Sequence, residues 1–114
     1  MADSATEKRR SKRYQVRIPA TLRGVDVMGR GYFVQAEVIS LDDHGARVQW
    51  RYLVKPAEHV EVQLTDDNAP RRFRVVRRGE PGTPEEKQAG LEFVDEKESW
   101  NVAELVAKWG VENL

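Results

Sequence analysis

Apolar and polar side chains alternate most clearly at residues 14–23, which read YQVRIPATLR. Val16, Ile18, Ala20 and Leu22 fall on one face of this pattern, and mostly polar residues fall on the other. Strict alternation over this length is typical of a β-strand that buries one face. Pro19 cannot donate a backbone hydrogen bond, which predicts an edge position or a bulge there.

Five later segments favour strands because they are rich in β-branched and aromatic residues or repeat the alternation. They are residues 32–39, 46–50, 59–64, 71–78 and 87–94, separated by segments at 24–31, 40–45, 51–58, 65–68 and 79–86 that favour turns and loops. A small, mainly β chain must protect its strand edges, and closure into a barrel removes them. The pattern therefore predicts a six-stranded antiparallel β-barrel.

At the end of the chain, the spacing of apolar residues changes from the alternation of a strand to that of a helix. Trp100, Ala103, Val106 and Ala107 follow helical spacing, with Ser99 as a candidate N-cap. Gly110 stands where a helix would end. We expect a mobile tail at 1–7, a barrel domain at 8–95, and a C-terminal amphipathic α-helix at 96–114 that packs on the barrel.

Composition narrows the classes of protein. The chain has 114 residues, no cysteine, and no apolar run long enough to cross a bilayer. Residues 1–13 lack the apolar centre of a secretory signal, so we expect a cytoplasmic domain without membrane insertion. The two histidines lie fifteen residues apart without metal-ligand spacing, and no nucleophile motif or phosphate loop is present. The expectation is a binding domain, not an enzyme, with no metal or cofactor.

Charge is distributed unevenly although the formal net charge is zero. Residues 1–17 hold six basic and two acidic side chains, residues 71–78 hold five arginines, and residues 85–114 hold eight acids against three lysines. The basic segments favour an anionic ligand. General affinity for DNA or RNA is not expected, because the domain as a whole is not basic.

Three short motifs stand in a definite order. Residues 9–13 read RRSKR directly before Tyr14, residues 40–45 read SLDDHG, and residues 90–93 read GLEF. Together they resemble the PilZ domain family, the bacterial receptor module for cyclic di-GMP, over about residues 8–95. The family pattern has Arg-x-x-x-Arg before an aromatic residue, then Asp or Asn-x-Ser-x-x-Gly, and then a similar last strand.

The resemblance implies a cyclic di-GMP site and names its residues. Arg9 and Arg13 would contact guanine and phosphate, with Arg10 as an auxiliary, because a guanidinium group binds phosphate with two hydrogen bonds and stacks on a base. Ser40, Asp42 and Gly45 would form the second half of the site. Gly45 is expected to preserve the geometry of the turn.

The second motif departs from the family pattern. Ser40 stands in place of Asp or Asn, and Asp42 stands in place of Ser. A carboxylate at Asp42 opposes a phosphate unless an arginine neutralises it, and Arg47 is the first candidate. The segment could therefore bind ligand or simply form a hairpin turn.

Three functions follow from these observations. The favoured one is a cyclic di-GMP receptor, and the second is a degenerate PilZ-like adaptor that binds a protein partner through the acidic helix or an edge strand. The third is a barrel that binds single-stranded nucleic acid through the arginines of residues 71–78. This last is the weakest, because only Phe73 supplies an aromatic platform within that run.

Overall fold

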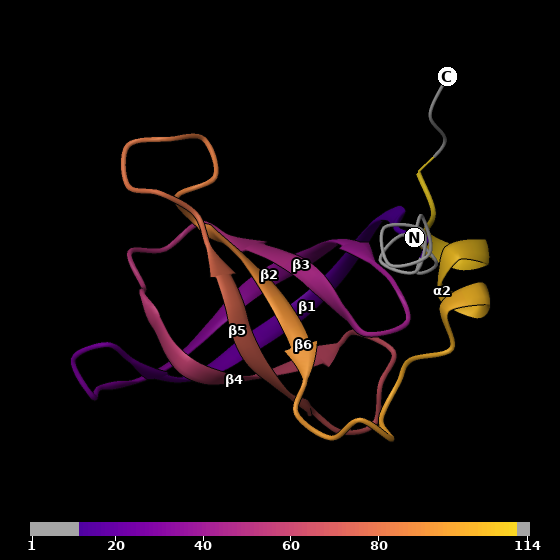
Figure 1. Ribbon diagram of the computed structural model, residues 1–114, viewed down its shortest axis with the longest axis horizontal. Coiled ribbons are helices and arrows are strands. Elements are labelled where there is room, and N and C mark those ends of the chain that lie inside the picture. The colour runs from indigo at the N-terminus through magenta and orange to yellow at the C-terminus, as the bar shows by residue number, and fades with distance from the viewer. Residues whose placement is uncertain (1–11, 112–114) are drawn as a thin grey trace, which may run out of the picture.

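Six antiparallel strands close into one barrel in the computed structural model, which describes residues 12–111 (Figure 1). The strands are β1 (Tyr14–Asp26), β2 (Gly31–Leu41), β3 (Gly45–Trp50), β4 (Pro56–Leu64), β5 (Arg71–Arg78) and β6 (Gln88–Phe93). Neighbours around the barrel follow the order β1-β2-β3-β6-β5-β4. The predicted mainly β fold, a six-stranded antiparallel barrel followed by a C-terminal helix, is confirmed.

The first strand is the longest, with 13 residues, and it pairs with β2 along one edge and with β4 along the other. Leu22 lies opposite Val34 of β2 and opposite Val62 of β4. The register with β2 shifts between Gln15 and Ile18, so the irregularity predicted near Pro19 lies just before it. Pro19 has no N–H to donate, and its carbonyl accepts a hydrogen bond from the Thr65 N–H at 3.0 Å, beyond the end of β4.

The barrel interior is filled by the apolar faces that alternation predicts. The largest fully buried side chains are Phe73, Ile18, Leu22, Leu41, Val16, Val38, Val48 and Val62. At one end an aromatic cluster closes the core. Phe73 and Phe93 lie 4.5 Å apart between ring centroids, and Trp100 lies 5.1 and 5.3 Å from them. Such contacts add to the stabilisation that burial alone provides.

Several strand limits differ from the sequence expectation. β1 continues to Asp26 and β2 begins at Gly31, so the expected loop at 24–31 is only a tight turn. The Asp26 Oδ1 atom closes this turn by accepting hydrogen bonds from the N–H groups of Met28 and Arg30. β4 begins at Pro56 and not at residue 59, since pairing with β1 continues to Asp26. β2 runs through Leu41, which leaves residues 42–44 for the next turn.

The helix α2 (Val102–Trp109) begins later than expected. Asn101, and not Ser99, is the N-cap, and its side chain accepts a hydrogen bond from the Glu104 N–H at 3.1 Å. Trp100 therefore lies outside the helix and fills the end of the barrel. Gly110 ends the helix as expected and forms a β-bridge with Val16 of β1.

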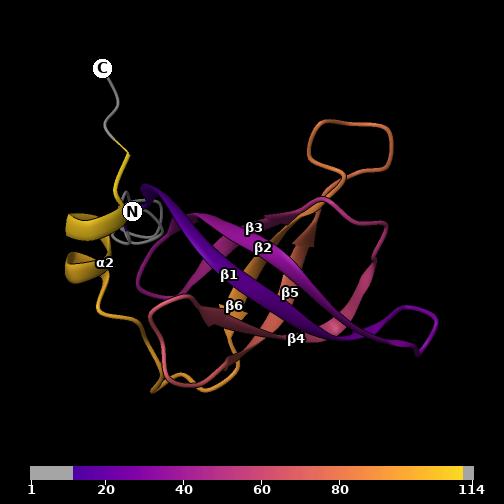
Figure 2. The same ribbon diagram turned by 180° about the vertical axis from the view of Figure 1, so that it is seen from behind.

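The two ends of the barrel differ. Figures 1 and 2 show α2 beside one end and the β1–β2 turn projecting at the other. Contacts between helix and barrel go to β1, with Val102, Leu105, Val106 and Trp109 half-buried against the core. Among residues 12–111, no helix is long and apolar enough to cross a membrane.

Candidate functional site

The turn between β2 and β3 is built around the carboxylate of Asp42. Its Oδ1 atom accepts hydrogen bonds from the N–H groups of His44 at 2.8 Å and Gly45 at 3.0 Å. Its own N–H donates to the Gly45 carbonyl at 3.0 Å. An aspartate that bonds the backbone two and three residues ahead fixes a tight turn. The position of its second oxygen, Oδ2, is fixed as well.

Gly45 is required for a reason that the sequence did not indicate. A Cβ atom at this position would lie 1.8 Å from the Leu91 carbonyl oxygen of β6. The positive-φ glycines in the described part of the chain are Gly29 and Gly82, so Gly45 is not needed for an unusual backbone conformation. The expectation that it serves turn geometry is corrected: Gly45 permits the close approach of two strands.

Arg13 lies beside this turn. Its Nη2 atom is 3.6 Å from Asp42 Oδ2, and about half of its side chain is exposed. Lys12 precedes it, with its ammonium group 5.4 Å from the ring centroid of Tyr14. Arg9 and Arg10, the other predicted ligand contacts on this segment, lie outside the described residues. The structure thus brings one predicted arginine against the second motif.

Ser40 is placed differently from the other predicted site residues. It belongs to β2, where it pairs with Gln15 of β1 and Arg47 of β3, and it is only 3% exposed. A side chain this buried offers almost no surface to a ligand. Asp42 and Gly45 line the surface beside Arg13, whereas Ser40 is buried and does not line it.

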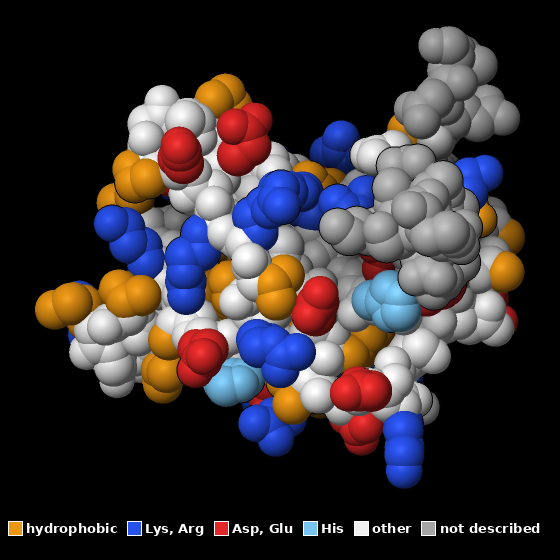
Figure 3. Space-filling view, viewed as in Figure 1, with side chains coloured by type: hydrophobic (Ala, Val, Ile, Leu, Met, Phe, Trp, Pro, Cys, Tyr) orange, Lys and Arg blue, Asp and Glu red, His pale blue; other side chains and the backbone are white. Residues whose placement is uncertain are grey.

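A hollow of about 600 Å³ opens next to Arg13 and the Asp42 turn. This volume is in the range of pockets that hold small molecules. Its walls come from the segment before β1, the β2–β3 turn, and strands β3, β5 and β6. They are formed by Lys12, Arg13, Asp42, His44, Gly45, Ala46, Arg47, Val76, Arg77, Gly90, Leu91 and Glu92. Figure 3 shows Lys and Arg side chains gathered over the face of β5 and β6.

The hollow favours an anion. Its two acids each have an arginine nearby, Asp42 with Arg13 and Glu92 with Arg74, the latter at 3.5 Å. Arg47 donates to the side-chain oxygen of Gln88 at 3.2 Å, so the arginine proposed to neutralise Asp42 is engaged elsewhere. Within residues 12–111, Lys12, Arg47 and Arg77 have no acidic partner within 4.0 Å. Positive charge is therefore in excess.

Sequence reasoning missed Arg77 and Gly90 as wall residues. Alternation along β6, with Ala89, Leu91 and Phe93 buried, would have placed Gly90 on the outer face. Arg77 could not have been found in this way, because the register between β5 and β6 shifts between Val75 and Arg77. A bulge of this kind changes the face on which later residues lie.

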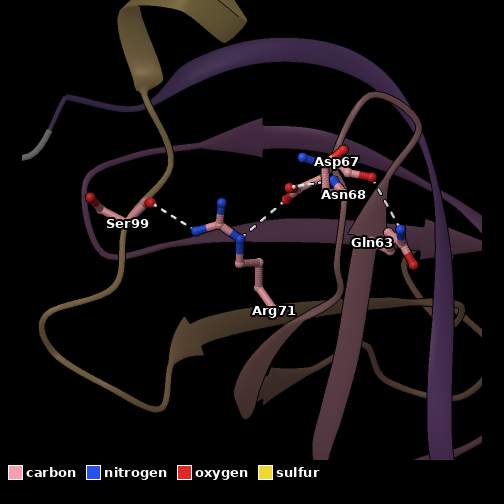
Figure 4. Close-up of polar contacts among 5 residues, drawn as sticks. All are labelled: Gln63, Asp67, Asn68, Arg71 and Ser99. Carbon is pink, nitrogen blue, oxygen red and sulfur yellow. Dashed lines mark hydrogen bonds and ion pairs between the residues drawn. The ribbon is translucent and has the colours of Figure 1, made fainter.

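The arginine run of β5 is mostly engaged within the barrel. Arg71 donates from Nε to Asp67 Oδ2 at 3.1 Å and from Nη1 to the Ser99 carbonyl at 3.2 Å, which joins the β4–β5 turn to the segment before α2 (Figure 4). Arg74 pairs with Glu92, and Arg78 donates to the Pro56 carbonyl. This leaves few free cations on β5 and gives no support to a nucleic-acid surface.

The described residues give little support for metal binding or acid–base catalysis. Among residues 12–111, no group of three or more His, Asp or Glu side chains could hold a metal ion. In the same part of the chain, Tyr32 shows the one clear pKa shift. Burial raises the pKa of its hydroxyl to about 12; the positive charge of Arg78 lowers this pKa by a smaller amount, and the negative charge of Asp26 raises it slightly. Tyr32 does not line the hollow.

The fold and the hollow together define a small β-barrel domain with a hollow on its outer face in which basic side chains outnumber acidic ones. A family model described as PilZ domain matches residues 7–107, so the chain belongs to the PilZ domain family. PilZ domains are in general receptor domains of cyclic di-GMP signalling rather than enzymes. Searches of the curated proteins and of the solved structures found no match.

Proposed function

We propose that this chain is a cyclic di-GMP receptor domain of bacterial, cytoplasmic second-messenger signalling, and that the ligand binds in the hollow beside Arg13. The observation that carries the proposal is the position of Arg13 next to the Asp42 turn, at the mouth of a hollow of about 600 Å³ with excess positive charge. Cyclic di-GMP is a compact dianion with two planar guanines, and arginine suits both groups.

The proposed roles follow from position. Arg13 contacts a phosphate or a guanine edge, and Arg9 and Arg10, just before it in the chain, complete the basic segment. Asp42 holds the turn through His44 and Gly45. Gly45 lets the turn lie close to β6, and Ser40 supports the loop from β2, where it is buried.

Calorimetric titration with cyclic di-GMP tests the proposal. Arg13→Ala should weaken binding by about tenfold to a hundredfold, because a charge-assisted contact is worth about 1.5–3 kcal/mol. Arg23→Ala is the matched control: Arg23 lies on β1, its side chain is exposed to about the same extent as that of Arg13, and it pairs with Glu61 at 2.6 Å, away from the hollow. The Arg9→Ala, Arg13→Ala double variant should lose more. Unchanged binding by that double variant would refute this site, and no binding by the native chain would refute the function.

A second candidate function is an adaptor that binds a protein partner without the nucleotide. A mostly apolar hollow of about 570 Å³ at the other end of the barrel favours it. Val27, Met28, Tyr52 and Leu53 line this hollow and are more than half exposed, Leu53 by 91%. Exposed apolar clusters of this kind often mark contact surfaces.

The two functions make different predictions for one experiment. An adaptor would give no heat of binding with cyclic di-GMP, and replacing Leu53 by Asp would abolish binding of its partner without changing the fold. A receptor would bind the nucleotide with or without this substitution, because Leu53 does not line the hollow beside Arg13.

A further inference from the structure

Arg47, Gly90 and Arg77 form one row across the outer face of three adjacent strands. Arg47 of β3 pairs with Gly90 of β6, and Gly90 pairs on its other side with Arg77 of β5. All three line the hollow beside Arg13. The centre of the row has no side chain, and we call this position between the two arginines the slot.

Gly90 is needed at the centre of the row because the side chain of Arg77 already lies close to it. A Cβ atom there would lie 3.3 Å from the Cβ of Arg77 and 4.0 Å from a methyl carbon of Val76. A larger side chain would fill the space in which a ligand could reach the β6 backbone. The register shift between Val75 and Arg77 brings Arg77 opposite this glycine.

The width of the slot suits one planar ring. Neighbouring strands lie about 4.8 Å apart, which places the Arg47 and Arg77 backbones about 10 Å apart across β6. A ring stacked on both faces needs roughly 7–8 Å between the flanking planes, since contacting carbon atoms lie about 3.5–4 Å apart. On this backbone spacing, one planar ring has room between the two arginine side chains and a second ring does not.

The charges of the two arginines are available for such a contact. Within the described residues neither has an acidic partner within 4.0 Å, and Arg47 is held by Gln88 at 3.2 Å. A guanidinium plane stacks on a base through cation–π and dispersion attraction. Glu92, an acid of the hollow two residues after Gly90, is paired with Arg74.

We propose that the slot over Gly90 holds one guanine of the ligand between the guanidinium planes of Arg47 and Arg77. This rests on the proposed function, since cyclic di-GMP supplies the base. In this proposal Arg47, Gly90 and Arg77 bind one base by stacking, while Arg13 binds a phosphate or the second guanine.

Three variants test the slot by calorimetric titration with cyclic di-GMP on the full chain. Arg77→Lys keeps the charge but removes the plane, and should weaken binding by about tenfold. Gly90→Val fills the slot, keeps every charge, and should weaken binding at least as much. Arg72→Ala is the control, because Arg72 lies on the same strand but does not line the hollow. It should bind like the native chain.

A spectroscopic measurement on the native chain keeps the test valid if a variant unfolds. A base stacked over Gly90 should shift the Gly90 amide proton signal through its ring current when cyclic di-GMP is added. Native binding with no shift at Gly90, or with Arg77→Lys binding as tightly as the native chain, overturns the slot and leaves the receptor function standing. No binding by the native chain overturns both.

Discussion

Arg13 and Asp42 face each other with 3.6 Å between guanidinium Nη2 and carboxylate Oδ2. In the sequence, Asp42 adds a negative charge to the second motif that the family pattern lacks, and Arg47 is the first candidate to neutralise it. In the structure the arginine beside Asp42 is Arg13, which belongs to the first motif. The two motifs are therefore paired with each other, and in the proposed site the nucleotide would compete with Asp42 for Arg13.

The first prediction concerns this competition. Asp42→Asn keeps an oxygen that can accept from the His44 and Gly45 N–H groups but removes the charge. An exposed ion pair is worth about 0–1 kcal/mol, so releasing Arg13 should tighten cyclic di-GMP binding by up to about fivefold. Titration at two salt concentrations measures the change, which should shrink at high salt. Weaker binding would mean that Asp42 positions Arg13 for the ligand.

Ser40→Asn restores the first residue of the family's second motif, and its effect should differ from that of Asp42→Asn. Ser40 is 3% exposed, so a larger polar side chain must be fitted into a packed region. We expect a loss of about 1–3 kcal/mol in the free energy of unfolding. Urea denaturation of this variant measures the loss. Unchanged stability would show that the site relaxes easily.

The second prediction is that Gly45→Ala is strongly destabilising. The new Cβ would lie 1.8 Å from the Leu91 carbonyl oxygen, and backbone atoms cannot rotate away. Pairing of β3 with β6 would have to shift, at a cost of at least about 2 kcal/mol. Urea denaturation should show this, whereas Gly31→Ala, whose Cβ would meet its nearest atom at 3.9 Å, should change stability by less than about 0.5 kcal/mol. Equal effects would refute the close-approach argument.

The third prediction separates the two tryptophans at the end of the chain. Trp100 is 7% exposed and packs against Phe73 and Phe93, so Trp100→Ala should lower the free energy of unfolding by about 3–5 kcal/mol. Trp109 is half-buried on α2, and its replacement should cost clearly less. Thermal unfolding of both variants is the measurement. Equal losses would show that α2 belongs to the core as fully as Trp100 does.

These residues also show what the sequence could and could not predict. The barrel was predictable because alternation directly reports which face of a strand is buried, as at Ile18 and Leu22. The start of the helix was not, because Ser99 and Asn101 are both good N-caps, and packing of Trp100 on Phe73 decides between them. The need for glycine at position 45 could not be predicted either, because it depends on the close approach of Leu91, which is distant in sequence.

The candidate site was predictable only in part. Motif spacing indicated Arg13, Asp42 and Gly45, which the structure brings to one hollow. It could not indicate the Arg13–Asp42 pair, because ion pairs between distant segments depend on the fold. It also missed Arg77, since the bulge in β5 breaks the period of two on which strand predictions depend.

The last prediction uses the hydroxyl of Tyr32. Burial raises its pKa from 10.0 to about 12, and the atom has no hydrogen-bond partner among the described residues. In the unfolded chain the hydroxyl loses its proton near pH 10, whereas the folded protein keeps it until about pH 12. The stability linked to this group is therefore complete below pH 10 and is lost as the pH rises through about 12.

Tyr32→Phe removes the ionising group and keeps the ring. Urea denaturation at pH 8 and pH 11 should show a smaller drop in stability for the variant than for the native chain, because other ionising groups affect both equally. At pH 8 the variant should be as stable as the native chain or up to about 1 kcal/mol more stable, since it no longer buries an unpaired hydroxyl. Equal drops in the two proteins would show that Tyr32 ionises normally in the folded state, and that its hydroxyl is reached by water.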